Sequence, residues 1–200
     1  MVQSYCFQDC KEGSSNFTAC HIHDVFKNKR CNYIDPHDGG IGISQNDNSV
    51  PIALKMDLSK EDWFAFEDNF GTSEEKAFVA YFKTFIPELR KKYNKVYLVR
   101  NERQLAIYSF DGGERFEPDY LLFLHKENAD GYEQLQVFIE PKGTHLVGND
   151  KWKEDFLLEI EDRAVATKVF VDDNKYRIWG FHFFNTDIRM SEFTDDMNRL

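Results

Sequence analysis

The chain has 200 residues, of which 42% are hydrophobic and 16% aromatic, and its formal net charge is −10. This composition predicts one domain with a hydrophobic core and excludes global disorder. The negative charge argues against a broad basic surface of the histone type. No segment approaches the roughly 18 apolar residues of a membrane span, and the first residues lack the basic start and apolar run of a signal peptide. We therefore expect a cytoplasmic protein without a membrane partner.

Residues 1–50 are rich in Asn, Asp, Gly, Ser and Cys, and their weak periodicity predicts a loop-rich N-terminal appendage. All cysteines of the chain lie there, namely Cys6, Cys10, Cys20 and Cys31. His21 and His23 lie among them, but only half of the ligand spacing of a zinc site is present. We expect reduced thiols. A structural zinc ion bound by the four cysteines is the alternative.

Residues 51–70 are predicted to be a linker that docks on the core through its aromatic side chains. After this linker the segment TSEEKAFVAYFKTFIPELRKKY predicts a helix. Thr72 or Ser73 caps its start, and Pro87 interrupts it or begins a second short helix. Glu75 falls on the apolar stripe of this helix, so we expect its carboxylate to be buried.

The remaining segments alternate between the two kinds of periodicity. They predict, in chain order, a strand at 95–101, a strand at 103–110, two strands within 115–146, a helix at 151–164 and a strand at 175–185. The first two strands are separated by a short polar break, which predicts a hairpin. Residues 71–185 thus predict an α/β (α+β) domain with the order helix, three or four strands, helix, strand. Its mixed central sheet would be flanked by helices, and residues 186–200 would form a short capping or frayed tail.

The second predicted hairpin carries charges near the ends of its apolar arms. If it is centred between Ala129 and Asp130, Asp119 lies directly opposite Glu140. Lys142 then lies one step further along the same face. Charges in an apolar strand are costly unless they are paired, so these residues either lie at a solvated edge of the sheet or surround a metal ion.

Two adjacent carboxylates repel each other unless a cation lies between them, and Mg²⁺ prefers oxygen ligands and keeps some water. The carbonyl of Pro141 could supply a third protein oxygen, and Glu75 could add a further carboxylate from the first helix. Lys142 would lie near a water molecule that the metal activates. The alternative is a salt-bridged strand end in which Lys142 neutralises Asp119 and Glu140.

The segments SEEKAFV, FEPDYLLFL and VFIEPKGTHL, in this order, resemble the PD-(D/E)xK nuclease superfamily. Within it they resemble most the C-terminal endonuclease domain of type III restriction enzyme Res subunits, over about residues 70–185. The resemblance implies a restriction-endonuclease-like core and cleavage of double-stranded DNA with Mg²⁺, for which Mn²⁺ can substitute. It implies that Asp119, Glu140 and the Pro141 carbonyl bind the metal, that Lys142 is the catalytic lysine and that Glu75 is the helix glutamate of many members.

Several basic residues near this motif could contact DNA. His145 follows the Lys-Gly turn, and Lys151 and Lys153 open the next helix, where a solvated helix face is the alternative. A second basic cluster comprises Arg90, Lys91, Lys92 and Lys95. Its position at a helix C-terminus explains it equally well, because cations are favourable there.

The sequence therefore predicts a metal-dependent endonuclease domain, similar to the cleavage module of a type III restriction system. No Gly-x4-Gly-Lys-Ser/Thr phosphate loop is present, so this chain cannot be the motor of such a system. The resemblance implies a helicase or translocase domain and a Mod-type methyltransferase subunit as its partners. One alternative is a catalytically silent module of the same fold for DNA binding or subunit docking. Another is a stand-alone nuclease of repair or junction resolution.

Overall fold

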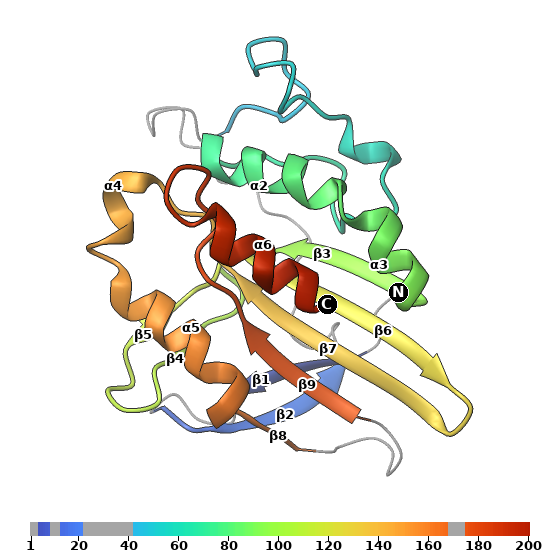
Figure 1. The fold of residues 1–200 in the computed structure, drawn as a ribbon, viewed down its shortest axis with the longest axis vertical. Coiled ribbons are helices and arrows are strands. Elements are labelled where there is room, and N and C mark those ends of the chain that lie inside the picture. Colours follow the sequence, from blue (N-terminus) through green and yellow to red (C-terminus); the bar gives the residue numbers. More distant parts are fainter. Residues whose placement is uncertain (1–3, 9–12, 22–41, 168–174) are drawn as a thin grey trace.

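A computed structural model describes residues 4–8, 13–21, 42–167 and 175–200 of the chain. Its centre is a four-stranded sheet in the order β3–β6–β7–β9 (Figure 1). The strands are Lys95–Arg100, Tyr120–Asn128, Gly131–Ile139 and Lys175–Gly180. The β3–β6 and β6–β7 pairs are antiparallel and the β7–β9 pair is parallel. The fold is therefore a mixed α+β arrangement with helices around a mixed sheet, as the sequence predicts.

Helices cover both faces of this sheet (Figure 1). One face packs against α2 (Ser73–Lys83), α3 (Ile86–Lys92) and α6 (Met190–Arg199), and the other against α4 (Thr144–Val147) and α5 (Lys151–Arg163). Because strand side chains alternate, Leu122 faces α2 whereas Leu121 faces α5. Both faces are apolar, so the strands are buried on two sides, which explains their nearly continuous hydrophobic sequence.

The helical segment before the sheet begins and breaks where the sequence predicts. The side chain of Thr72 accepts a hydrogen bond from the Glu75 N–H, and the Glu75 carboxylate accepts one from the Thr72 N–H, which forms a capping box. Glu75 is 6% exposed, so its predicted burial is confirmed. The break falls between α2 and α3, and Pro87 lies in the first turn of α3, where no hydrogen bond needs its missing N–H.

The predicted hairpin of residues 95–101 and 103–110 is wrong. The first strand, β3, pairs with β6, while β4 (Ile107–Tyr108) pairs with β5 (Arg115–Phe116). The buried Asn101 side chain redirects the chain between them. Its amide donates to the carbonyls of Leu105 and Pro118, both at 2.8 Å, and its oxygen accepts from the Leu105 N–H. These bonds replace hairpin pairing by a fixed loop.

A second sheet takes two of its strands from residues 1–50, for which the sequence predicts a loop-rich appendage, and its third from the segment after α5. It has the order β1–β2–β8, formed by Ser4–Gln8, Asn16–His21 and Val165–Thr167. Phe17 is fully buried and packs 6.5 Å from Phe138, and Gln8 bonds both backbone groups of Tyr108. This sheet therefore shares the core on the α5 side. The side chains of Cys6, Cys10, Cys20 and Cys31, on which the zinc alternative depends, lie outside the described residues.

The segments before and after the predicted domain also contribute to the core. Trp63 and Phe64, which follow the short helix η1 (Leu58–Lys60), are 1% and 5% exposed and contact the α2 face. Residues 190–199 form the regular helix α6, and its Phe193 and Met197 are buried. This tail is part of the fold because its apolar stripe covers the sheet. Among the described residues, no helix has the length and apolar character needed to cross a bilayer.

Candidate functional site

The predicted carboxylates meet where β6 begins and β7 ends. The two strands pair Tyr120 with Ile139 and Asn128 with Gly131, which confirms the hairpin centre predicted from the sequence. Asp119 and Glu140 are the next residues in this register. The Asp119 N–H donates to Glu140 Oε2 at 3.0 Å, so the two residues are in direct contact.

Lys142 joins them on the α5 side of the sheet. Leu121 and Phe138, each two residues from a carboxylate along its strand, pack in the α5-side core, so Asp119 and Glu140 share that side. The Lys142 Nζ lies 2.7 Å from Glu140 Oε1 and 2.9 Å from Asp150 Oδ2. The predicted trio is therefore assembled, and Asp150 is an additional carboxylate.

The charged side chains of this cluster shift one another's pKa values. Burial alone would lower the pKa of Lys142, but its ion pairs with Glu140 and Asp150 outweigh burial and raise that pKa, so the ammonium stays charged at neutral pH. Burial raises the pKa of Glu140, although Lys142 opposes this effect. Asp150 shows the opposite balance, since hydrogen bonds from Lys142 and Lys153 outweigh its burial and lower its pKa.

Asp119 is the least compensated member of the cluster. Burial raises its pKa well above the ordinary value of 3.8, and the negative charges of Glu140 and Glu75 raise it further. Within the described part of the chain, no N–H or O–H group donates to its carboxylate, although a buried carboxylate normally accepts several hydrogen bonds. A bound cation would stabilise such a carboxylate, because it lies near a second carboxylate and accepts no hydrogen bond from the described segments that would offset its charge.

The Pro141 carbonyl is a second oxygen without a partner. Pro141 forms a parallel bridge with Phe184, in which the Glu140 carbonyl and the Lys142 N–H bond Phe184. Neighbouring carbonyls alternate along an extended chain, so that of Pro141 points to the opposite side, where Asp119 precedes the first residue of β6. The residue is buried, and among the described residues no donor contacts this oxygen.

Glu75 approaches the same end of the sheet from its other face. Its Oε1 accepts from the Arg100 Nε at 3.0 Å, and its Oε2 accepts from the Thr72 N–H at 2.6 Å. Burial opposes the charge of Arg100, but Glu75 together with Tyr120 and Glu102 outweighs burial and raises the pKa of the guanidinium. Both Glu75 oxygens are thus engaged, and the residue acts on Asp119 through its charge.

The donor set fits a hard cation that keeps water ligands. In the described segments, no three His, Cys, Asp or Glu side chains lie together in an arrangement that could bind a metal. The available oxygens are two carboxylates and one carbonyl, of which the Asp119 carboxylate and the Pro141 carbonyl have no donor. Mg²⁺ is commonly bound by one or two carboxylates together with water and substrate phosphate, so this set suits Mg²⁺ better than a metal that requires a full protein cage.

The predicted DNA contacts flank the cluster. A Cβ atom at Gly143 would lie 3.1 Å from His145 Cε1 and 3.5 Å from Glu74 Oε1, so both side chains border this turn. Lys151 is exposed and pairs with Asp155. Lys153 is less exposed and pairs with Asp150 at 3.0 Å, which ties it to Lys142.

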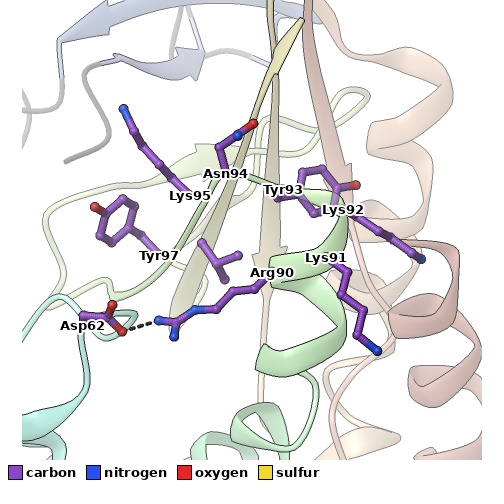
Figure 2. Close-up of a pocket in the computed structure, with 9 residues that line it drawn as sticks. Asp62, Arg90, Lys91, Lys92, Tyr93, Asn94, Lys95 and Tyr97 are labelled. Atoms are coloured by element: carbon purple, nitrogen blue, oxygen red, sulfur yellow. Dashed lines mark hydrogen bonds and ion pairs between the residues drawn. The ribbon is translucent and has the colours of Figure 1, made fainter.

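A separate polar surface lies at the opposite end of β3 and contains the predicted basic cluster. It borders a pocket of about 380 Å³ lined by Asp62, Arg90, Lys91, Lys92, Tyr93, Asn94, Lys95, Val96 and Tyr97. Figure 2 shows Arg90 paired with Asp62, while Lys91 and Lys92 point away from Tyr97. Asp62 is the single carboxylate of this lining and is already neutralised, so the pocket lacks the paired acids of the sheet end.

Comparisons with known proteins give a family and one distant relative. Residues 12–197 match the family described as HI_1054_C, C-terminal domain. A protein of Haemophilus influenzae described as uncharacterized is 31% identical over 179 residues, which cover 86% of this chain and 36% of the relative. The chain thus spans about a third of the length of this relative. No solved structure matches the chain.

Proposed function

We propose that this chain, which belongs to the HI_1054_C family and matches it over residues 12–197, is a metal-dependent endonuclease domain. It would hydrolyse DNA phosphodiester bonds, and the proposal rests on its own residues. We further propose that α2, the four-stranded sheet and α5 form a restriction-endonuclease-like core, similar to that of type III Res subunits. A helicase or translocase domain and a Mod-type methyltransferase remain its proposed partners.

The single observation that carries this proposal is the state of Asp119. Its carboxylate is half-buried and receives no hydrogen bond from the described residues, while its backbone N–H donates to Glu140 and the Glu140 charge raises its pKa. Leaving a buried charge uncompensated is unfavourable, by several kcal/mol for a fully desolvated ion as a rough figure. A cation between Asp119 and Glu140 would remove this penalty and would also use the Pro141 carbonyl.

Asp119, Glu140 and the Pro141 carbonyl would hold Mg²⁺, which when bound would lower the pKa of water and offset negative charge on the phosphate. Glu140 could keep its present bonds, because each carboxylate oxygen has two lone pairs. Lys142 Nζ remains oriented by Asp150 and would face the attacking water and the scissile phosphate. Hydrolysis joins the water oxygen to phosphorus and breaks the bond to one ester oxygen, which leaves as a hydroxyl with a proton from that water.

A catalytically silent module is the second candidate, and the Glu140–Lys142–Asp150 pairs favour it. Such an ion-paired brace at a strand end needs no metal, and it would fix the β7 end against α5. It does not account for Asp119, whose carboxylate receives no hydrogen bond or ion pair from the described residues. The two candidates therefore differ most sharply at Asp119.

A plasmid nicking assay in Mg²⁺ would test the proposal with the intact chain, Asp119→Asn, Lys142→Met and the control Asp130→Asn. Asp130 lies exposed at the far tip of the same hairpin. We expect both site variants to lose on the order of 100-fold or more in rate, the usual scale for acid–base and charge-stabilising groups. The control should keep its rate. Equal activity in all four proteins, or none in the intact chain, would remove the enzymatic candidate.

Calorimetric titration with Mn²⁺ distinguishes the nuclease from the catalytically silent module. The proposed site binds the ion in the intact chain and loses it in Asp119→Asn. A silent brace would show no Mn²⁺ binding that depends on Asp119. Thermal unfolding of each variant checks that the fold is retained.

A further inference from the structure

The first turn of α5 exposes a large aromatic side chain next to the candidate site. Trp152 is 37% exposed, whereas Trp63 and Trp179 are 1% and 9% exposed. It follows Lys151 at the start of the helix and lies two residues after Asp150, the carboxylate that accepts from Lys142. An exposed indole at this position is either a surface residue without a binding role or a residue that contacts a ligand.

The Trp152 indole packs against a buried aromatic ring. The Phe116 ring of β5 meets it in a T-shaped contact with centroids 6.3 Å apart, and Phe116 itself is 3% exposed and packs on Phe156. Aromatic pairs of this geometry restrict ring orientation. Trp152 therefore presents its exposed surface from a rigid base.

A cation accompanies the indole and connects it to the site. Lys153 Nζ lies 5.8 Å from the centroid of Trp152 and 5.9 Å from that of Phe116. The same nitrogen is 3.0 Å from Asp150 Oδ2, and that oxygen is 2.9 Å from Lys142 Nζ. Trp152 is thus linked to the proposed catalytic lysine through Lys153 and one shared carboxylate.

An aromatic plane beside a positive charge matches the chemistry of a nucleotide. Single-strand binding proteins stack bases on aromatic side chains and hold the backbone with cations. Stacking tolerates any base because every base has a π-face. A base inside an intact duplex is already stacked on its neighbours, so such a surface selects a nucleotide that is unpaired or turned out of the helix.

We propose that Trp152 and Lys153 form a base-stacking subsite for one unpaired nucleotide of a DNA strand that enters the Asp119–Glu140–Lys142 site. This inference rests on the proposed function and adds a substrate preference to it. The strand to be cut would carry an unpaired or unstacked nucleotide beside the scissile phosphate. Lys153 would exchange part of its pairing with Asp150 for a backbone phosphate.

Binding can be measured without cleavage, by anisotropy of a labelled 12-nucleotide oligothymidine and of a matched duplex in EDTA. We expect Trp152→Ala to weaken single-strand binding about 10-fold, in line with the loss of one stacked base, and Trp152→Phe to retain most of it. Duplex binding should change less than about threefold. Tyr132→Ala, an aromatic change at the far end of β7, should leave both unchanged.

Intrinsic fluorescence gives a second readout, because Trp152 is the exposed tryptophan of the three. Unlabelled oligothymidine should quench the intact chain and not Trp152→Phe. Two affinity results would overturn the subsite: unchanged single-strand affinity in Trp152→Ala, or equal losses for single strand and duplex. Absence of quenching by oligothymidine in the intact chain would also overturn it, and would indicate that the exposed Trp152 serves a protein partner. The binding measurements are made in EDTA and do not depend on cleavage. If oligothymidine quenches Trp152 but the intact chain does not nick plasmid in Mg²⁺, the subsite is retained and the nuclease proposal is rejected.

Discussion

The two faces of one sheet end carry buried ion pairs that differ in how fully their oxygens are used. On the α2 face, Glu75 accepts from both Arg100 and the Thr72 N–H. On the α5 face, Glu140 and Asp150 share Lys142, but Asp119 beside them receives no donor from the described residues. The first arrangement is closed and stabilises the fold. In the second, the Asp119 carboxylate has no hydrogen-bond or ion-pair partner among the described residues that offsets its charge. Buried charges alone therefore do not indicate a binding site, and an unpaired group among them is the more informative feature.

The largest expected effect comes from opening the closed pair. Glu75→Ala removes the more buried of the two carboxylates that pair with Arg100, the other being Glu102, and half of the capping box. We therefore expect a loss of roughly 3 kcal/mol of unfolding free energy. Urea unfolding measures this. Glu74→Ala, in the same helical turn, removes a carboxylate that bonds only the exposed Ser73 hydroxyl and should change stability by less than about 0.5 kcal/mol. Similar losses for both variants would contradict the closed pair.

A smaller effect is expected from loosening the open cluster at Asp150. We regard Asp150 as a positioning residue for Lys142, so Asp150→Asn should slow plasmid nicking about 10-fold. The variant also removes a negative charge that raises the pKa of Lys142. The alkaline limb of the rate profile should therefore move to lower pH, a change that a merely structural role would not produce. Asp155→Asn, which frees only the exposed Lys151, should leave rate and profile unchanged.

The smallest effect, on stability, concerns Asp119 and has the opposite sign. Its folded-state pKa lies above that of the unfolded chain, so the native state binds more protons between the two values. Stability therefore falls as pH rises through this window. Asp119→Asn carries no such charge and should be more stable than the intact chain at pH 7, by on the order of 1 kcal/mol.

This gain should shrink as the pH falls toward the ordinary carboxyl value of 3.8. Thermal unfolding between pH 4 and 8 in EDTA measures it, with Asp130→Asn at the far tip of the hairpin as the control. A variant that is less stable than the intact chain at neutral pH would mean that the Asp119 carboxylate is already compensated.

Two features of the site follow from local sequence. The β6–β7 register depends on one short turn between two apolar runs, and both are local, so Asp119 and Glu140 could be placed opposite each other in advance. Glu75 could be placed on a buried stripe for the same reason, since helical periodicity and a capping Thr lie within one turn. Asp150 and Trp152 carried no comparable signal, because their relation to Lys142 depends on where α5 packs.

The sequence alone determined the hairpin frame, the capped helix α2 and the apolar runs of the central strands, because each arises from residues a few positions apart. The tertiary structure decided that β3 pairs with β6 and not with β4, and that β1, β2 and β8 form one sheet. It also decided that Lys142 is shared by Glu140 and Asp150. Such choices join segments far apart in the chain, and competing pairings have similar local preferences, so only the packing of the whole core selects among them.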